Sequence, residues 1–177
     1  IEPAGIGHIA SMIGRYFAMD RDRRWQRVKS AYDLLTQGRA EFMAENPQAG
    51  LEAAYARGET DEFVKATAIL PPDGKPVKME DGDSVIFLNF RSDRARQLSR
   101  PFIEPDFSEF EREATPRLAT YCTLTGYSDD FAVSVAFPPE RIKTPQDPPR
   151  ASSINPLYRL WVHGFDVHDL AAVAARE

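Results

Sequence analysis

The sequence has one cysteine, Cys122, among its 177 residues. A single thiol cannot form an internal disulfide, which excludes a disulfide-stapled scaffold and leads us to expect a cytoplasmic protein. No apolar run reaches the roughly 18 residues of a membrane-spanning helix, and no basic segment precedes the N-terminal apolar stretch as it would in a signal peptide. We therefore expect neither a membrane partner nor a secreted chain.

The chain also lacks an excess of positive charge. It has 22 Lys and Arg against 27 Asp and Glu, a net charge of −5, so nucleic acid is not an expected partner. Much of the positive charge is concentrated in residues 15–29, the first basic island, and residues 91–100, the second basic island. Two such islands on an acidic protein favour a small anionic ligand over a long polyanion.

Several motifs of catalysis and metal binding are missing. The sequence has no GxSxG, no glycine-rich phosphate loop and no CxxC pair. Its histidines are His8, His163 and His168, and the five-residue spacing of the last two does not place them on one helix face. Cys122 lies in the apolar run LATYCTLT, which favours a core thiol over a nucleophile.

Apolar runs and helical patterns alternate along the chain. SVIFLNF, residues 84–90, is the clearest predicted strand, and its lack of polar alternation is typical of a strand buried on both faces of a parallel sheet. Further strands are predicted within residues 8–14, 63–70, 118–125 and 131–137. Helices are predicted from residue 25 to Gly38, over residues 47–57 starting at Pro47, and directly after residue 90. This alternation predicts an α/β fold, a layered domain with a mostly parallel sheet flanked by helices.

Each basic island directly follows a predicted strand. Ligands of open α/β sheets bind beyond the carboxyl ends of strands, and helix starts favour anions. The planar guanidinium fork can bind a phosphate or a carboxylate through two hydrogen bonds. We predict that four arginines converge on one anion: Arg15, Arg21, Arg91 and Arg94.

The other charged residues of the islands have a simpler interpretation. Four later arginines are interpreted as belonging to solvated helix faces: Arg24, Arg27, Arg96 and Arg100. The three acidic residues among the arginines are interpreted as ion-pair partners that orient the guanidinium groups: Asp20, Asp22 and Asp93.

Two long motifs cover the same islands: ASMIGRYFAMDRDRRWQRVKSAYDLL and DGDSVIFLNFRSDRARQLSRPF. They resemble the phosphotransferase domain of the 2,3-bisphosphoglycerate-independent phosphoglycerate mutases, and GLEAAYARGETDEFVKATAI and VAFPPE fit the same family in the same order. The resemblance implies interconversion of 3-phosphoglycerate and 2-phosphoglycerate in glycolysis and gluconeogenesis. In this family the reaction proceeds through a phosphoserine, with two metal ions, usually manganese. The resemblance also implies that Arg15, Arg21, Arg91 and Arg94 bind the substrate.

Several functional residues of the family are missing from this sequence. We find no counterpart of the family's serine nucleophile, of its metal-binding Asp and His residues, or of its substrate-binding His, Asp–Asp pair and Lys. We therefore predict no catalytic residue and no metal ligand in this chain, and expect no manganese to bind it. Residues 1–143 are expected to form part of the substrate-binding (phosphotransferase) domain, and residues 144–177 a divergent Pro-rich linker and tail.

Three interpretations of the whole chain stay open. The first is a fragment of the isomerase that binds phosphoglycerate, is inactive alone and is monomeric. The absence of an N-terminal Met and the divergence after Glu140 fit a truncated or frameshifted frame, or a genuine short protein with a diverged tail. The alternatives are a stand-alone binding module for phosphorylated sugar acids and a non-catalytic interaction protein.

Overall fold

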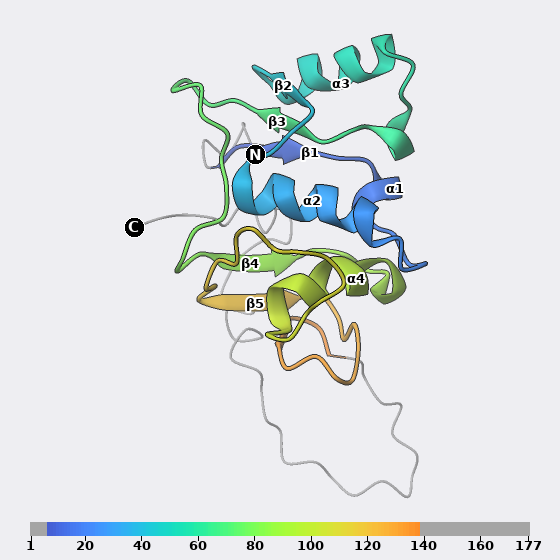
Figure 1. The fold of residues 1–177 in the computed structure, drawn as a ribbon, viewed down its shortest axis with the longest axis vertical. Helices are drawn as coiled ribbons and strands as arrows, with labels where there is room; N and C mark the ends of the chain where they lie inside the picture. Colours follow the sequence, from blue (N-terminus) through green and yellow to red (C-terminus); the bar gives the residue numbers. More distant parts are fainter. Residues whose placement is uncertain (1–6, 139–177) are drawn as a thin grey trace, which may run out of the picture.

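The structure is a computed structural model that describes residues 7–138. The expected tail at residues 144–177, with His163 and His168, therefore lies outside the described residues. Strands and helices are interspersed along the described part of the chain (Figure 1). The elements are β1 (Ser11–Met12), α1 (Arg15–Ala18), α2 (Trp25–Gln37), β2 (Phe42–Ala44), α3 (Pro47–Ala56), the 3₁₀ helix η2 (Asp61–Phe63), β3 (Thr67–Ile69), β4 (Ser84–Phe87), α4 (Ser92–Ile103), β5 (Thr120–Thr123) and β6 (Ser134–Val135).

The strands pair in two groups of three. One sheet has the order β1-β3-β2 and the other the order β4-β5-β6. β2 pairs with β3, β4 with β5, and β5 with β6, all in parallel, whereas β1 and β3 are antiparallel. The predicted α/β class with mostly parallel pairing is confirmed, although the pairs are divided between two sheets where one was expected.

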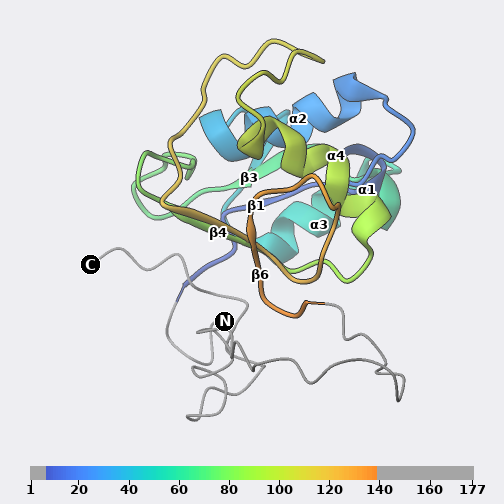
Figure 2. The same cartoon turned by 90° about the horizontal axis from the view of Figure 1, so that it is seen from below.

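The helices lie on both sides of the strands. In Figure 2, α2 and α4 are on one side and α3 is on the other. Figure 1 shows α2 running across the region between the two sheets. One buried cluster joins α2 to α4 and to the segment after it, through Val28, Ala31, Tyr32, Leu98, Phe107 and Phe110. Phe87 of β4 packs against this cluster, so burial of the α2 face links the helices to the strand that leads into the second basic island.

Local sequence accounts for the two long helices of the first half. Val28 and Tyr32 are buried along α2, as their spacing predicts, and Gly38 ends this helix with a φ of 65°, which glycine adopts without strain. The side chain of Asn46 accepts a hydrogen bond of 2.8 Å from the Ala49 N–H at the start of α3. The first residue of α3 is Pro47, a position where proline loses no helical hydrogen bond.

The prediction that residues 84–90 are buried on both faces is wrong. β4 is shorter than predicted, and along it exposed and partly buried residues alternate. Phe87 packs on the core, whereas Ile86 is 38% exposed and Leu88 is 45% exposed. The reason is that, within residues 7–138, the core cluster covers only the face of β4 that carries Phe87. An apolar run without polar alternation is therefore compatible with a one-sided strand.

The remaining sequence predictions concern the short elements, Cys122 and membrane-spanning helices. β2 and the single turn of α1 were not predicted, and the other four predicted strands are found as β1, β3, β5 and β6. Cys122 is buried in β5, and burial raises the pKa of its thiol, which confirms the core interpretation. Over residues 7–138, each helix is too short or too polar to span a bilayer.

Candidate functional site

The first basic island begins at a tightly packed glycine. The Gly14 N–H donates a 2.7 Å hydrogen bond to the carbonyl of Val64. A Cβ on Gly14 would lie 2.3 Å from the carbonyl oxygen of Glu62, a distance that no side chain can occupy without backbone movement. This close approach places the start of α1 beside η2. There, Nη2 of Arg15 lies 3.1 Å from Oε2 of Glu62.

The loop after α1 is organised around the carboxylate of Asp20. Asp20 is only 3% exposed, and its Oδ2 accepts hydrogen bonds of 2.9 Å from the backbone N–H groups of Asp22 and Arg24. Between those two residues, Arg23 has a φ of 58°, in the left-handed region that side chains other than glycine rarely adopt. Nη1 of Arg27 lies 3.5 Å from Oδ1 of Asp20. The Asp20 carboxylate thus fixes the loop that carries Arg21.

The exit of β4 is held by Tyr127. Its hydroxyl lies 2.8 Å from the carbonyl oxygen of Phe87 and 2.7 Å from that of Asn89, and accepts from the Asn89 N–H at 3.1 Å. The Asn89 side chain in turn accepts a 3.2 Å hydrogen bond from the Arg91 N–H. Arg91 occupies the N-cap position of α4, and this network fixes the turn from which its side chain leaves.

One carboxylate joins the two basic islands. Asp93, in the first turn of α4, accepts hydrogen bonds at Oδ2 from Nη1 of Arg21 at 3.1 Å and from Nη2 of Arg91 at 3.0 Å. Its Oδ1 accepts from Nε of Arg91 at 3.2 Å. Nη1 of Arg94 donates a 3.1 Å hydrogen bond to the carbonyl of Met19, in the loop that carries Arg21. Segments about 70 residues apart in the sequence, the distance from Arg21 to Arg91, thus meet at one surface.

Charge at this surface is predominantly positive and open to solvent. The side chains of Arg21 and Arg91 remain 48% and 59% exposed while paired with Asp93. Hydrogen bonds from Arg91 and then Arg21 lower the pKa of Asp93 to about 2, so it is ionised at neutral pH. Since each guanidinium has five N–H donors and Asp93 engages one from Arg21 and two from Arg91, donors are left for an anionic ligand.

The structure therefore places the four predicted arginines in two ways. Arg21, Arg91 and Arg94 come together through Asp93 and the Met19 carbonyl. Arg15, at the start of α1, instead pairs with Glu62 of η2. The role of all four in binding an anion stays a prediction.

The remaining charged residues of the islands have partners of their own. The predicted ion pairing of Asp20, Asp22 and Asp93 is confirmed. The later arginines bind local partners as well as facing solvent: Arg24 pairs with Asp22, Arg27 stacks on Tyr16, Arg96 donates to the Tyr127 carbonyl, and Arg100 pairs with Glu104 and Asp130.

Sequence reasoning missed the residues that fix the arginines. Tyr127 and Glu62 are distant in sequence from the residues they contact, and no local pattern identifies either of them. Asp20 gives a usable signal, because an aspartate followed by polar residues often accepts a hydrogen bond from the backbone two residues later.

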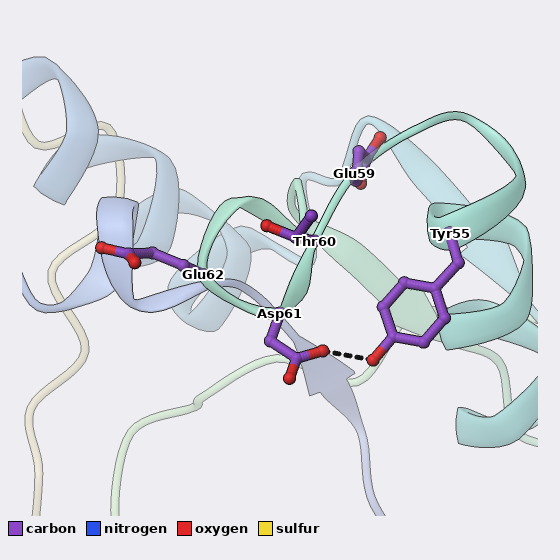
Figure 3. Close-up of a pocket in the computed structure, with 5 residues that line it drawn as sticks. All are labelled: Tyr55, Glu59, Thr60, Asp61 and Glu62. Atoms are coloured by element: carbon purple, nitrogen blue, oxygen red, sulfur yellow. Dashed lines mark hydrogen bonds between the residues drawn. The ribbon is translucent and has the colours of Figure 1, made fainter.

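An open hollow of about 510 Å³ lies between the end of α3 and η2, and one of its lining residues is Glu62, the partner of Arg15 (Figure 3). Its lining residues are Tyr55, Glu59, Thr60, Asp61 and Glu62. Figure 3 shows the Tyr55 hydroxyl bonded to Asp61 and the side chain of Glu62 directed away from this pair. Three carboxylates line this hollow, which makes it a less favourable place for a phosphate than the surface of Arg21, Arg91 and Arg94.

A metal site of the kind the resemblance implies does not fit residues 7–138. In this part of the chain, no three His, Cys, Asp or Glu side chains are grouped so as to hold a metal ion. The acidic residues of the arginine surface are engaged by guanidinium groups instead.

Comparison with known proteins identifies the family of this chain. The family profile described as the N-terminus of BPG-independent PGAM matches residues 1–129. The chain is 90% identical to the 2,3-bisphosphoglycerate-independent phosphoglycerate mutase of Thiobacillus denitrificans over 143 residues, which are 81% of this chain and 28% of that protein. It is 61% identical to the enzyme of the same name from Pseudomonas aeruginosa over 136 residues, 77% of this chain and 26% of that protein.

A solved structure shares the fold. The crystal structure of Leishmania mexicana phosphoglycerate mutase at low cobalt concentration superposes with a TM-score of 0.64 at 28% identity, over 69% of this chain and 23% of that one. The chain thus spans little more than a quarter of the length of these curated relatives. Since the family profile and the relatives match most of its length, the chain belongs to the family of 2,3-bisphosphoglycerate-independent phosphoglycerate mutases, which are isomerases.

Proposed function

We propose that this chain holds phosphoglycerate through Arg15, Arg21, Arg91 and Arg94, of which Arg21, Arg91 and Arg94 already meet at one surface. The observation that carries the proposal is the pairing of Arg21 and Arg91 with one carboxylate, that of Asp93. The Asp93 carboxylate already occupies the point where the two guanidinium groups meet, and the N–H donors that it does not engage stay available to a second anion. Phosphoglycerate carries a phosphate and a carboxylate, so it can engage several guanidinium forks at once.

The reaction we propose for the protein that contains this sequence is the interconversion of 3-phosphoglycerate and 2-phosphoglycerate. In it, the arginines of this chain position the substrate and neutralise its charge. A nucleophile and metal ions, manganese in this proposal, supply the phosphoryl chemistry that arginines cannot replace. We therefore expect a glycolytic, cytoplasmic enzyme, with residues 1–143 forming part of its substrate-binding domain, and no turnover by this monomeric chain alone.

Binding of 3-phosphoglycerate, followed by calorimetry, tests the proposal. Each charge-assisted hydrogen bond contributes about 1.5–3 kcal/mol, so Arg91→Ala is expected to weaken binding at least about tenfold. Arg117→Ala is the matched control, because Arg117 pairs with Asp81 and its side chain is 87% exposed. Arg100 is less suitable as a control, since it also contacts Glu104 and Asp130.

The same preparation separates the two interpretations that involve phosphoglycerate binding from the non-catalytic interaction protein. Binding without turnover in a coupled assay with added manganese agrees with a substrate-holding part of the enzyme or with a stand-alone module. No binding by the wild-type chain, or an equal loss in both variants, would contradict the proposal and leave the non-catalytic interaction protein as the better account.

A further inference from the structure

We propose that Asp93 is a positioning residue, whose carboxylate holds Arg21 and Arg91 in the relative arrangement that binds a ligand with two anionic groups. This inference rests on the function proposed above. Asp93 is the one residue whose side chain is hydrogen-bonded to arginines of both basic islands in the described part of the chain.

The geometry suits a positioning role. Arg91 approaches Asp93 with Nε and Nη2, so the carboxylate engages one edge of the guanidinium fork and leaves the other edge to a ligand. Arg21 uses only Nη1. Asp93 itself is short and is held by the backbone of the first turn of α4, where a negative charge is stabilised by the helix dipole. A short acceptor on a helix thus anchors two long side chains from different segments.

Removing the negative charge of Asp93 has two opposite effects on the affinity for anions. A carboxylate beside an anion site repels the anion, so removing it should strengthen anion binding if nothing else changes. Without Asp93, however, Arg21 and Arg91 repel each other, and both side chains must be ordered when the ligand binds. A ligand that needs both guanidinium groups then binds more weakly. Inorganic phosphate can be bound by one arginine fork, so it gains from the lost repulsion.

The test compares two anions on three forms of the full chain: wild type, Asp93→Ala and Asp22→Ala. Asp22 is the matched control, an exposed carboxylate that pairs with Arg24 in the same loop. We expect Asp93→Ala to lower the affinity for 3-phosphoglycerate about tenfold, the loss that follows when two arginine side chains must be ordered on binding. Its affinity for inorganic phosphate should stay equal or rise, and Asp22→Ala should leave the ratio of the two affinities unchanged.

Several results would overturn the inference. If Asp93→Ala binds both anions more tightly, Asp93 is only a counter-charge, and if neither affinity changes, it has no role in binding. A third result is that Asp93→Ala lowers the melting temperature and the affinities for both anions, while Asp93→Asn, which keeps one acceptor oxygen, restores both affinities. In that case the role of Asp93 is structural. If the wild-type chain does not bind 3-phosphoglycerate, the proposed function fails, and this inference fails with it.

Discussion

Replacing Tyr127 by Phe should destabilise the chain by removing one hydroxyl group at the exit of β4. Tyr127 is 1% exposed, and its hydroxyl lies within 3.1 Å of three backbone groups of Phe87 and Asn89. One hydroxyl donates a single hydrogen at a time, so the loss is one donated and one accepted hydrogen bond. At about 0.5–1.5 kcal/mol each, the free energy of unfolding should fall by about 1–3 kcal/mol. The aromatic contact between Phe87 and residue 127, with ring centroids 5.6 Å apart, is kept by Phe.

Urea denaturation followed by circular dichroism measures this change. For a chain of this length, about 1–3 kcal/mol corresponds to a fall in melting temperature of about 2–12 °C. Tyr55→Phe is the control, because the Tyr55 hydroxyl contacts Asp61 at an exposed position, and its loss should cost less than about 0.5 kcal/mol. Equal midpoints for the Tyr127→Phe variant and the wild type would refute the view that this hydroxyl fixes the turn before Arg91.

Three further predictions concern the same loops. Gly14→Ala should lower the free energy of unfolding by about 3 kcal/mol or more, because the added Cβ would lie 2.3 Å from a backbone oxygen. Gly58 has open space around it but a φ of 81°, so Gly58→Ala should lower the free energy of unfolding by about 1–2 kcal/mol. Similar melting temperatures for the two variants would contradict this prediction. Asp20→Ala should lower the free energy of unfolding by about 2–3 kcal/mol, since two backbone N–H donors lose a buried carboxylate acceptor. Asp22→Ala should lower it by less than about 0.5 kcal/mol. An Asp22→Ala variant less stable than Asp20→Ala in urea would refute this prediction. The pKa of Asp93 lies at about 2, below its ordinary value of 3.8, so its stabilising effect is present above pH 3.8 and is lost as pH falls towards 2. The difference in stability between wild type and Asp93→Asn should therefore shrink in acid, and a constant difference would count against the ion pairs.

The long helices were predictable because their determinants are local. The stripe of Val28 and Tyr32 and the stop at Gly38 all act within α2, and Pro47 marks the start of α3. β2 was not predictable in the same way: it has three residues, its central Met43 is exposed, and it exists through pairing with β3 about 25 residues later in the sequence.

The candidate site was predictable in part. Its arginines follow strands, and this position in the sequence predicts one surface for both islands. The pairing of Arg15 with Glu62 was not predictable, because it depends on how closely Gly14 approaches η2. The same holds for Tyr127, which lies almost 40 residues from the turn that it holds. Contacts across such distances depend on the whole fold rather than on local spacing.

The most direct measurement of the central claim is an NMR titration that observes the arginine Nε–H groups while 3-phosphoglycerate is added. The account predicts that the signals of Arg21, Arg91 and Arg94 shift together with one dissociation constant, while those of Arg39 and Arg117, paired with Glu113 and Asp81 elsewhere, stay in place. Shifts confined to Arg39 and Arg117, or equal small shifts of every arginine, would show that the surface around Asp93 is not where the anion binds.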